Sequence, residues 1–232
     1  RFVMPPELLP YMTERPLYLS KCFQSSDRQR VSADAPTRAQ CGLPEDGFVY
    51  CSFNNNFKMT QEMFSLWMRV LQQVEGSVLW LLADNRWAQA NMLRCAAEHG
   101  VEASRLIFAP RVAPPDYLAR FTLADLFLDT FPYNAGTTAN DVLWMGTPIL
   151  TLSGRTYISR MAGSLLTNVG LPDLITTDMD AYERKAVQLG RNPRMVQTYK
   201  RYLAEHRQSS DLFDIPVFVK DLEKALSDLV TE

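Results

Sequence analysis

Residues 126–143 read LFLDTFPYNAGTTANDVL, a segment in which a buried-strand pattern breaks into a turn of small residues and restarts as a helix. The overlapping residues 124–129 form an apolar run that ends in an acid. Such a run is typical of a strand buried on both faces of a sheet. Proline, asparagine and glycine then break the pattern within 132–136. A helix follows, and we expect the hydroxyls of Thr137 and Thr138 to cap it.

The turn between this strand and this helix has the character of an anion-binding site. The first N–H groups of a helix and the positive end of its dipole point out of the carboxyl edge of the sheet. A phosphate oxygen fits there, and Thr137 and Thr138 add hydroxyl donors. Asp141 lies one turn after Thr137, so its carboxylate can accept from a ribose diol beside that phosphate. An ordinary capped helix behind a strand would show the same spacing, and that alternative stays open.

The rest of the chain alternates between predicted strands and helices from residue 47 onward. Such alternation is typical of an α/β protein with a Rossmann-like parallel sheet and helices on both faces. The carboxy-terminal region is predominantly helical. Strands are expected at 48–53, 77–82, 106–109, 124–129 and 148–152, and helices at 60–74, 87–99, 115–122, after 137, and at 157–168, 181–189, 193–207 and 216–229.

Composition and charge exclude several classes of protein. The chain has 232 residues, of which 47% are hydrophobic, so it can bury a sizeable core. Its net charge of −2 argues against a broad nucleic-acid surface. No apolar run approaches the roughly 18 residues of a membrane span, and no signal peptide opens the sequence. We therefore expect a cytoplasmic protein with neither a nucleic acid nor a membrane as partner.

Cysteines, histidines and glycine-rich motifs give little support to other chemistries. The four cysteines are widely spaced with no CxxC pair, so we expect buried free thiols and no metal site. His99 precedes Gly100 at a predicted helix end, which favours a capping role. The sequence contains no GxxxxGK[ST], GxGxxG or GxSxG motif, which argues against P-loop, dinucleotide-binding and serine-hydrolase sites.

Two further loops carry candidate binding residues. After the first predicted strand, Asn55 offers an amide, and Lys58 places a positive charge that could neutralise a diphosphate. After the third, Tyr117 and Arg120 lie at i, i+3 on a predicted helix, where an aromatic ring and a guanidinium could seat a flat base. A solvated lysine, or a packed tyrosine with its arginine in solvent, would fit the same residues.

Several motifs recur in the order and spacing of a known family. They are GLPEDGFVYCSFNNNFKMT, SVLWLL, RLIFAPRVAPPDYLARFTLADLFLDTFPYNAGTTANDVLWMGTPILT, SRMAGSLL and SSDLFD. Together they resemble the carboxy-terminal catalytic lobe of the O-GlcNAc transferase family, GT-B glycosyltransferases that bind a UDP-sugar. The resemblance implies that residues 40–232 form the UDP-sugar-binding lobe with its carboxy-terminal helices. It also implies that residues 1–39 are a connector and remnant of the amino-terminal catalytic lobe.

The resemblance assigns roles to the phosphate and ribose candidates. It places Lys58 on the diphosphate, Thr137 and Thr138 on phosphate oxygens, and Asp141 on the ribose hydroxyls. The family commonly reads His-Thr-Thr where this chain has Gly136, so one ring contact near the sugar phosphate is lost.

The residues expected near the uracil base match the family pattern less closely. Tyr117 stands where the family places a ring against uracil, and Arg120 stands alongside it. Asn55 replaces a glutamine that reaches the phosphates in animal members, and Pro114 replaces a lysine that some members carry near the base.

The resemblance implies inverting transfer of a sugar, most readily GlcNAc, from a UDP-sugar to a protein Ser or Thr, without a metal or other cofactor. Lys58 is the catalytic candidate, because its charge and the helix dipole would stabilise departing UDP. No general base is evident. In the family the acceptor groups come largely from the amino-terminal lobe, which tetratricopeptide repeats usually precede, so we expect this chain alone to be inactive.

Three alternatives stay open. The chain could be a UDP or nucleotide-sugar binding module that transfers nothing, or part of a protein N-glucosyltransferase that uses UDP-glucose. A nucleotide-sugar epimerase on a similar two-lobed fold would need an acid–base pair that the sequence does not supply.

Overall fold

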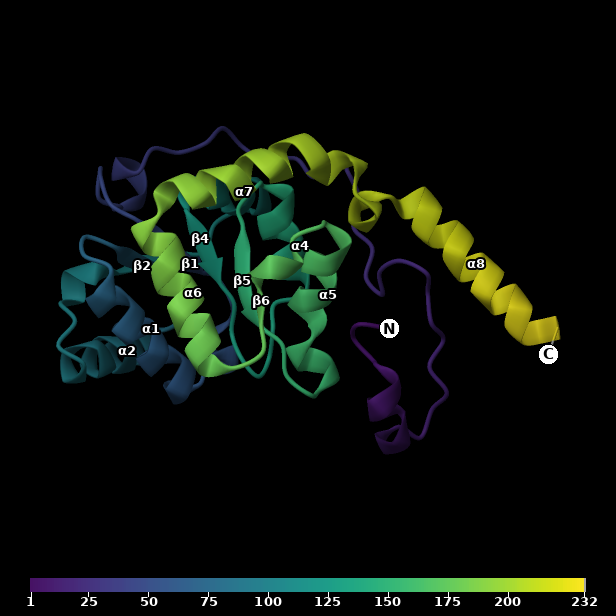
Figure 1. Cartoon of the computed structure of the whole chain (residues 1–232). Coiled ribbons are helices and arrows are strands. Elements are labelled where there is room, and N and C mark those ends of the chain that lie inside the picture. Colours follow the sequence, from purple (N-terminus) through teal and green to yellow (C-terminus); the bar gives the residue numbers. More distant parts are fainter. Residues whose placement is uncertain (232) are drawn as a thin grey trace.

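A single parallel sheet forms the centre of the computed structural model, which describes residues 1–231 (Figure 1). The strands lie in the order β3-β2-β1-β4-β5-β6, and every neighbouring pair is parallel. The predicted Rossmann-like parallel sheet is therefore confirmed. The strands are β1 (Val49–Ser52), β2 (Val78–Leu82), β3 (Leu106–Ala109), β4 (Leu126–Leu128), β5 (Ile149–Leu152) and β6 (Ile175–Thr176).

Helices link and cover these strands. Because parallel crossovers are right-handed, the helices between β1 and β3 and those between β4 and β6 cover opposite faces of the sheet. The α-helices are α1 (Gln61–Gln73), α2 (Arg86–Glu98), α3 (Pro114–Arg120), α4 (Thr137–Trp144), α5 (Met161–Asn168), α6 (Met179–Arg191), α7 (Pro193–His206) and α8 (Ile215–Thr231). The 3₁₀ turns are η1 (Pro6–Tyr11), η2 (Ala39–Cys41), η3 (Asn56–Lys58), η4 (Ala103–Arg105), η5 (Phe121–Leu123), η6 (Tyr157–Ser159), η7 (Pro172–Leu174), η8 (Arg207–Ser209) and η9 (Asp211–Phe213).

The sheet is buried on both faces. Every residue of β1, β2, β4 and β5 is buried, which explains why these strands read as continuous apolar runs and not as alternating patterns. Trp80 of β2 and Trp67 of α1 are both fully buried in the core between sheet and helices. After β6 the chain returns to lay α6 beside α1, where Arg69 and Glu183 form an ion pair at 2.7 Å.

Side-chain caps fix where several helices begin. Thr60, Asn85 and Asp178 each accept a hydrogen bond from the backbone N–H three residues later, at the starts of α1, α2 and α6. His99 is the C-cap residue of α2, as expected. These local signals account for the close agreement between the predicted and observed helix boundaries.

The sequence pattern missed two features beyond β5. Strand β6 has two residues, too few for a recognisable hydrophobic period. The helix expected over 157–168 is divided into η6 and α5, because the backbone of Arg160 leaves the helical region at φ −124° and ψ −1°.

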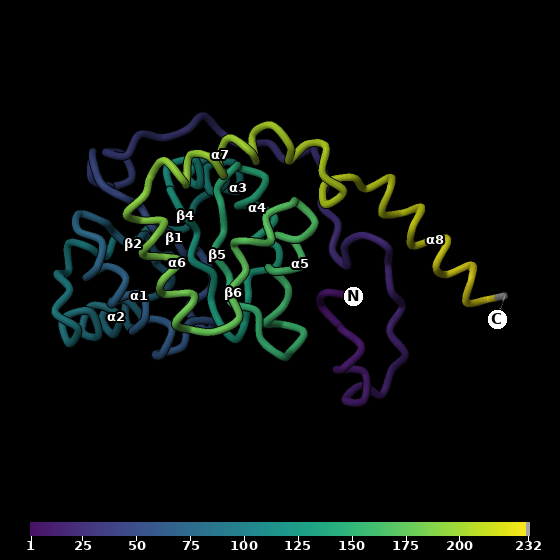
Figure 2. Tube along the Cα trace, in the orientation of Figure 1, coloured from purple at the N-terminus to yellow at the C-terminus, as the bar shows by residue number. Residues whose placement is uncertain are grey.

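The two ends of the described chain lie against each other beside the sheet. The backbone N–H of Ser20 donates to Asp221 of α8 at 2.7 Å, and Lys21 pairs with Asp211 at 2.8 Å. Figure 2 shows α8 running outward from the body next to the amino-terminal segment. Residues 1–231 include no helix that is both long and apolar enough to cross a membrane.

Candidate functional site

The candidate site lies where the strand order reverses, between β1 and β4. Strands on either side of this point lead their following helices to opposite faces, which leaves a crevice at the carboxyl edge where open α/β sheets bind ligands. Residues Tyr50 and Cys51 of β1 lie in register with Leu126 and Phe127 of β4. The loops that follow these two strands are therefore neighbours.

Lys58 joins these two loops. It closes η3 after β1, and its Nζ donates a hydrogen bond of 3.1 Å to the backbone oxygen of Asn134 in the loop after β4. The same Nζ lies 4.1 Å from the ring centroid of Tyr133. Burial lowers the pKa of Lys58, and the charge of Asp129 acts in the opposite direction. The structure thus brings Lys58 to the turn before α4.

The start of α4 differs from the prediction. We expected hydroxyl caps from Thr137 and Thr138, but the N-cap residue is Gly136, no side chain caps the helix, and both threonines lie in the first turn. An uncapped helix start keeps its N–H donors and the positive end of its dipole for an incoming anion. Thr137 is exposed and Thr138 half-buried, and both belong to the first turn of α4.

A buried carboxylate explains why α4 begins where it does. Asp129, directly after β4, is 0% exposed, and its Oδ1 accepts from the backbone N–H groups of Ala135 at 2.7 Å and Thr130 at 2.9 Å. Asn54 Nδ2 donates to the same oxygen at 3.3 Å, and Thr151 Oγ1 donates to Oδ2 at 2.7 Å. Asp129 therefore fixes the turn from both sides and sets the orientation of Gly136.

Burial also changes the acidity of Asp129. It raises the pKa of Asp129 from 3.8 to about 6, and the hydrogen bonds from Thr151, Ala135, Thr130 and Asn54 oppose this rise. A group with this pKa changes charge near neutral pH, directly behind the turn that holds the candidate anion site.

Asp141, the predicted ribose ligand, lies on α4 and is half-buried. Its Oδ1 pairs with Nη1 of Arg30, a residue of the amino-terminal segment that we had not considered. The pair is shielded, with 18% of the Arg30 side chain and 16% of the Asp141 side chain exposed.

Tyr117 lies on α3 in an aromatic cluster. Its ring centroid is 4.9 Å from that of Phe121 and 6.1 Å from that of Phe53. Burial raises the pKa of Tyr117, while a hydrogen bond with the Thr138 side chain opposes the rise. This contact joins the predicted base position to the start of α4.

The side chains of Arg120 and Asn55 form hydrogen bonds with neighbouring loops. Arg120 donates to the backbone oxygen of Pro110 at 2.6 Å. The guanidiniums whose charges act on Tyr117 are those of Arg111 and Arg30. Asn55 Oδ1 accepts from Arg111 at 3.0 Å, which attaches the loop after β1 to the loop after β3.

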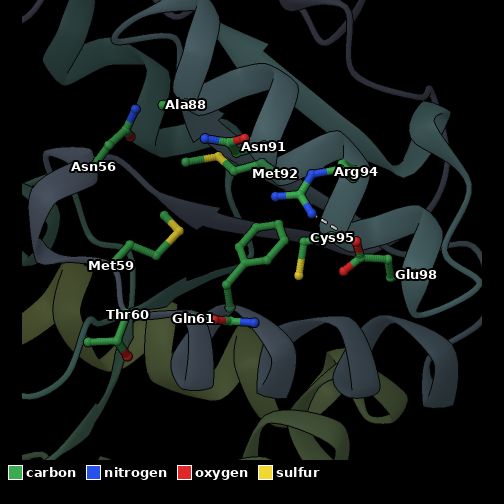
Figure 3. Close-up of a pocket in the computed structure, with 11 residues that line it drawn as sticks. Asn56, Met59, Thr60, Gln61, Ala88, Asn91, Met92, Arg94, Cys95 and Glu98 are labelled. Atoms are coloured by element: carbon green, nitrogen blue, oxygen red, sulfur yellow. Dashed lines mark hydrogen bonds and ion pairs between the residues drawn. The ribbon is translucent and has the colours of Figure 1, made fainter.

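A cavity of about 320 Å³ opens between the start of α1 and α2 (Figure 3). Phe64, Met92 and Cys95 line it, together with an Arg94–Glu98 ion pair at 3.0 Å. The predicted site residues do not line this cavity. Asn56 and Met59, which flank Lys58 in sequence, face it instead. The candidate site at the switch point is thus distinct from the cavity of Figure 3.

The model of glycosyl transferase family 41 matches residues 21–222. The chain belongs to glycosyl transferase family 41.

A probable UDP-N-acetylglucosamine–peptide N-acetylglucosaminyltransferase of Arabidopsis thaliana is 34% identical over 97% of this chain and 24% of its own length. The UDP-N-acetylglucosamine–peptide N-acetylglucosaminyltransferase of Caenorhabditis elegans is 33% identical over 83% of this chain and 17% of its own length. The chain therefore spans about a quarter or less of these relatives.

Solved structures agree with the assignment to family 41. An O-GlcNAc transferase mutant from Thermobaculum terrenum matches 97% of this chain and 43% of its own chain, with a TM-score of 0.87 and 28% identity. A sucrose-phosphate synthase from Thermosynechococcus elongatus, at 17% identity, matches 90% of this chain and 52% of its own with a TM-score of 0.63 and so shows the fold alone. The resemblance to the carboxy-terminal lobe of the O-GlcNAc transferase family is confirmed.

Gly136 is the main departure from the family 41 pattern noted in the sequence. A Cβ at this position would lie 2.7 Å from Cε of Met161 and 3.5 Å from Oε1 of Gln24. The methyl end of Met161 therefore occupies the space that a side chain at position 136 would enter.

Asn134, Asp129 and Arg30 hold the candidate site together but do not stand out in the sequence as site residues. Asn134 donates through Nδ2 to the backbone oxygens of Thr130 at 2.9 Å and Leu152 at 3.3 Å, which closes the loop after β4. An acid at the end of a buried strand was a signal that could have identified Asp129. No local signal marks Arg30, because its partner Asp141 is distant in sequence. Within residues 1–231, no group of His, Cys, Asp and Glu could hold a metal ion, and the four cysteines are unpaired.

Proposed function

We propose that this chain is the donor-binding part of an inverting glycosyltransferase that moves GlcNAc from UDP-GlcNAc to Ser or Thr of a protein. One observation carries the proposal: in a member of family 41, Lys58 reaches across the switch point to the loop that begins α4. The names of the relatives, which specify UDP-N-acetylglucosamine and a peptide, support this choice of donor and acceptor.

In the proposed complex, the diphosphate lies on the turn of Gly136–Thr138. Lys58 supplies a positive charge, and the first N–H groups of α4 supply donors at the positive end of its dipole. The hydroxyls of Thr137 and Thr138 complete the phosphate contacts. No metal is required, because these groups together offset the charge of the diphosphate.

The nucleoside extends from the diphosphate along α4. We assign the ribose hydroxyls to Asp141 and the uracil to the neighbourhood of Tyr117, with Arg120 and Asn55 at its edge. The contact between Tyr117 and Thr138 supports this arrangement, because it makes the base and phosphate positions adjacent.

The chemistry is displacement at the anomeric carbon. The acceptor hydroxyl oxygen forms a bond to that carbon on the face opposite UDP, and the bond from the carbon to the β-phosphate oxygen breaks with inversion. Negative charge grows on the departing β-phosphate, so Lys58 and the start of α4 bind the transition state more tightly than the ground state. The proton of the acceptor hydroxyl passes to a base, which we place on the amino-terminal lobe of the longer protein.

The length of the relatives suits a chain that is one half of a two-lobed catalytic region. The relatives are several times longer than this chain, and residues 1–39 are proposed to connect to an amino-terminal lobe that follows tetratricopeptide repeats. We also propose a cytoplasmic location, since four free cysteines suit a reducing compartment.

Calorimetric titration with UDP tests the proposed donor site. We expect the wild-type chain to bind UDP, and Asp141→Ala to weaken binding by about 1 to 3 kcal/mol through the loss of a charged hydrogen bond. Lys58→Met should weaken binding too, whereas Lys220→Met, an exposed lysine of α8, should not. The absence of UDP binding, or unchanged binding in both site variants, would contradict the proposal.

A transfer assay separates an enzyme from a binding module. The loss of a histidine at Gly136 is the observation that favours a module without transfer activity. We expect the full-length protein to transfer GlcNAc from UDP-GlcNAc to a peptide library, and this chain alone to transfer none, because positioning of the acceptor is worth up to about 7 to 11 kcal/mol. A full-length protein that binds UDP but transfers neither GlcNAc nor glucose would establish the binding module.

A further inference from the structure

A strap formed by residues 26–33 runs past the proposed nucleotide site. At one end the backbone N–H of Ser26 donates to the carbonyl of Leu212 at 3.1 Å. At the other, the backbone N–H of Ala33 donates to the carbonyl of Pro115, in the first turn of α3, at 3.1 Å. The strap is therefore attached on both sides of the position where its middle meets α4.

Arg30 is the residue through which the strap contacts α4. Its Nη1 pairs with Oδ1 of Asp141, and its Nη2 donates to the hydroxyl of Ser26, which is itself buried. A guanidinium that is bound through both Nη atoms has a fixed plane and a fixed orientation of its N–H groups. Because more than four-fifths of both charged side chains are shielded from solvent, this ion pair is screened less than a surface pair.

The surroundings of this ion pair are those of the proposed ribose and base positions. Asp141 follows Thr137 by one helical turn, and Thr138 contacts Tyr117. The charge of Arg30 also acts on Tyr117. Arg30 therefore stands where the ribose and uracil positions meet, although it comes from the connector and not from the sheet.

We propose that Arg30 is a positioning residue that orients the carboxylate of Asp141 for the ribose diol. Arg30 engages Oδ1 and so turns Oδ2 toward the ribose hydroxyls. This inference rests on the proposed function, because it assumes that Asp141 binds a ribose. It gives the connector a part in nucleotide recognition and makes the donor site depend on residues outside the Rossmann-like sheet.

Two uridine nucleotides distinguish positioning of Asp141 from other roles of Arg30. UDP and 2′,3′-dideoxy-UDP share the base and the diphosphate, but the second lacks the hydroxyls that Asp141 would bind. Titration calorimetry gives both dissociation constants, and their ratio reports the ribose contact alone. A purely structural role of the strap would change both constants together.

The substitution series isolates Arg30 within the strap. Arg30→Met removes the charge but keeps the stem, and Arg30→Lys keeps the charge but lacks the fork that also reaches Ser26. Arg28→Met is the matched control, because Arg28 lies two residues away and pairs with Asp214 at 2.9 Å, outside the proposed site. Circular dichroism melting of each variant confirms that it is folded.

We expect Arg30→Met to weaken the binding of UDP about tenfold and that of dideoxy-UDP less than twofold. The ratio of the two dissociation constants should then fall close to one. Arg30→Lys should give an intermediate ratio. Arg28→Met should keep the wild-type ratio. Combining Arg30→Met with Asp141→Asn should weaken UDP no further than Asp141→Asn alone, because both changes remove the same contact.

Other outcomes overturn the proposal in distinguishable ways. Equal weakening of both nucleotides by Arg30→Met would show that Arg30 does not act through the ribose hydroxyls, because it would then support the strap or contact the shared base and diphosphate. Tighter binding of UDP by Arg30→Met than by the wild type would mean that Arg30 competes with the ribose for Asp141. The same change of ratio in Arg28→Met would assign the effect to the strap as a whole. Failure of the wild-type chain to bind either nucleotide would refute the proposed function and this inference together.

Discussion

The backbone N–H of Ala135 donates to Oδ1 of Asp129 at 2.7 Å, which ties the end of β4 to the residue before Gly136. This hydrogen bond, and not a hydroxyl cap, determines where α4 begins. The orientation of the first helical N–H groups therefore depends on a carboxylate that is fully buried in the core. The same carboxylate also binds Asn54, after β1, and Thr151 of β5, so three neighbouring strands share it.

Asp129→Ala should lower the free energy of unfolding by about 3 to 5 kcal/mol. The substitution leaves the N–H groups of Ala135 and Thr130 buried without their acceptor, and each such loss costs about 1 to 3 kcal/mol. Urea unfolding provides the measurement. Asp84→Ala is the control, because Asp84 pairs with exposed Arg111 and should contribute at most about 1 kcal/mol. Equal losses for the two variants would contradict the structural role of Asp129.

Asp129 should also give the chain a specific pH dependence. Because burial raises its pKa from 3.8 to about 6, the folded chain binds more protons than the unfolded chain between these values, and stability falls as pH rises through this window. Asp129→Asn removes this titration while its amide keeps the acceptor oxygen for Ala135. The stability of the wild type relative to Asp129→Asn should therefore fall by about 2 to 3 kcal/mol from pH 4 to pH 6 and level off above pH 7. A difference that is constant with pH would show that the pKa of Asp129 is not raised.

A side chain at position 136 should fit only if the side chain of Met161 moves or is shortened. Gly136→His alone should change UDP binding little, because its Cβ lies 2.7 Å from the Met161 methyl group, which must first move aside. In a Met161→Ala background the same substitution should strengthen UDP binding several-fold, because the ring can then reach the phosphates. A double-mutant cycle measured by calorimetry gives the coupling. Additive effects of the two substitutions would refute the steric explanation.

Lys58→Ala in the full-length protein should lower kcat by about 10²- to 10³-fold with a smaller change in KM for the donor. Lys58 meets its largest opposing charge when UDP departs, so it acts mainly in the transition state. Steady-state kinetics with UDP-GlcNAc and a peptide provide the test, and Lys220→Ala is the control. An effect on KM alone would make Lys58 a group for ground-state binding.

The sequence predicted the strands and helices well where burial and local caps decide them. The continuous apolar runs of β1 and β2 and the capping residues Thr60 and Asn85 are signals contained in a few neighbouring residues. Residues 126–143 likewise predicted a strand, a turn and a helix, and the structure has all three. The sequence did not predict β6, because a strand of two residues is too short to show a hydrophobic periodicity.

The site depends more on tertiary contacts, and there the sequence was less informative. Strand order, which no local pattern specifies, brings Lys58 to the loop before α4. The expected cap at Thr137 was wrong because Asp129 holds the preceding turn from within the core. The pairing of Arg30 with Asp141 joins the connector to α4 between residues that are far apart in the sequence, and neither residue's neighbours indicate it.

The most direct test of the proposed donor site is a crystal structure of this chain with UDP. We expect the β-phosphate oxygens within hydrogen-bonding distance of Lys58 Nζ and of the N–H groups of Thr137 and Thr138, and the ribose hydroxyls on Asp141. UDP bound elsewhere, for example in the cavity between α1 and α2, with Lys58 still on the carbonyl of Asn134, would contradict the assignment of the switch point as the donor site.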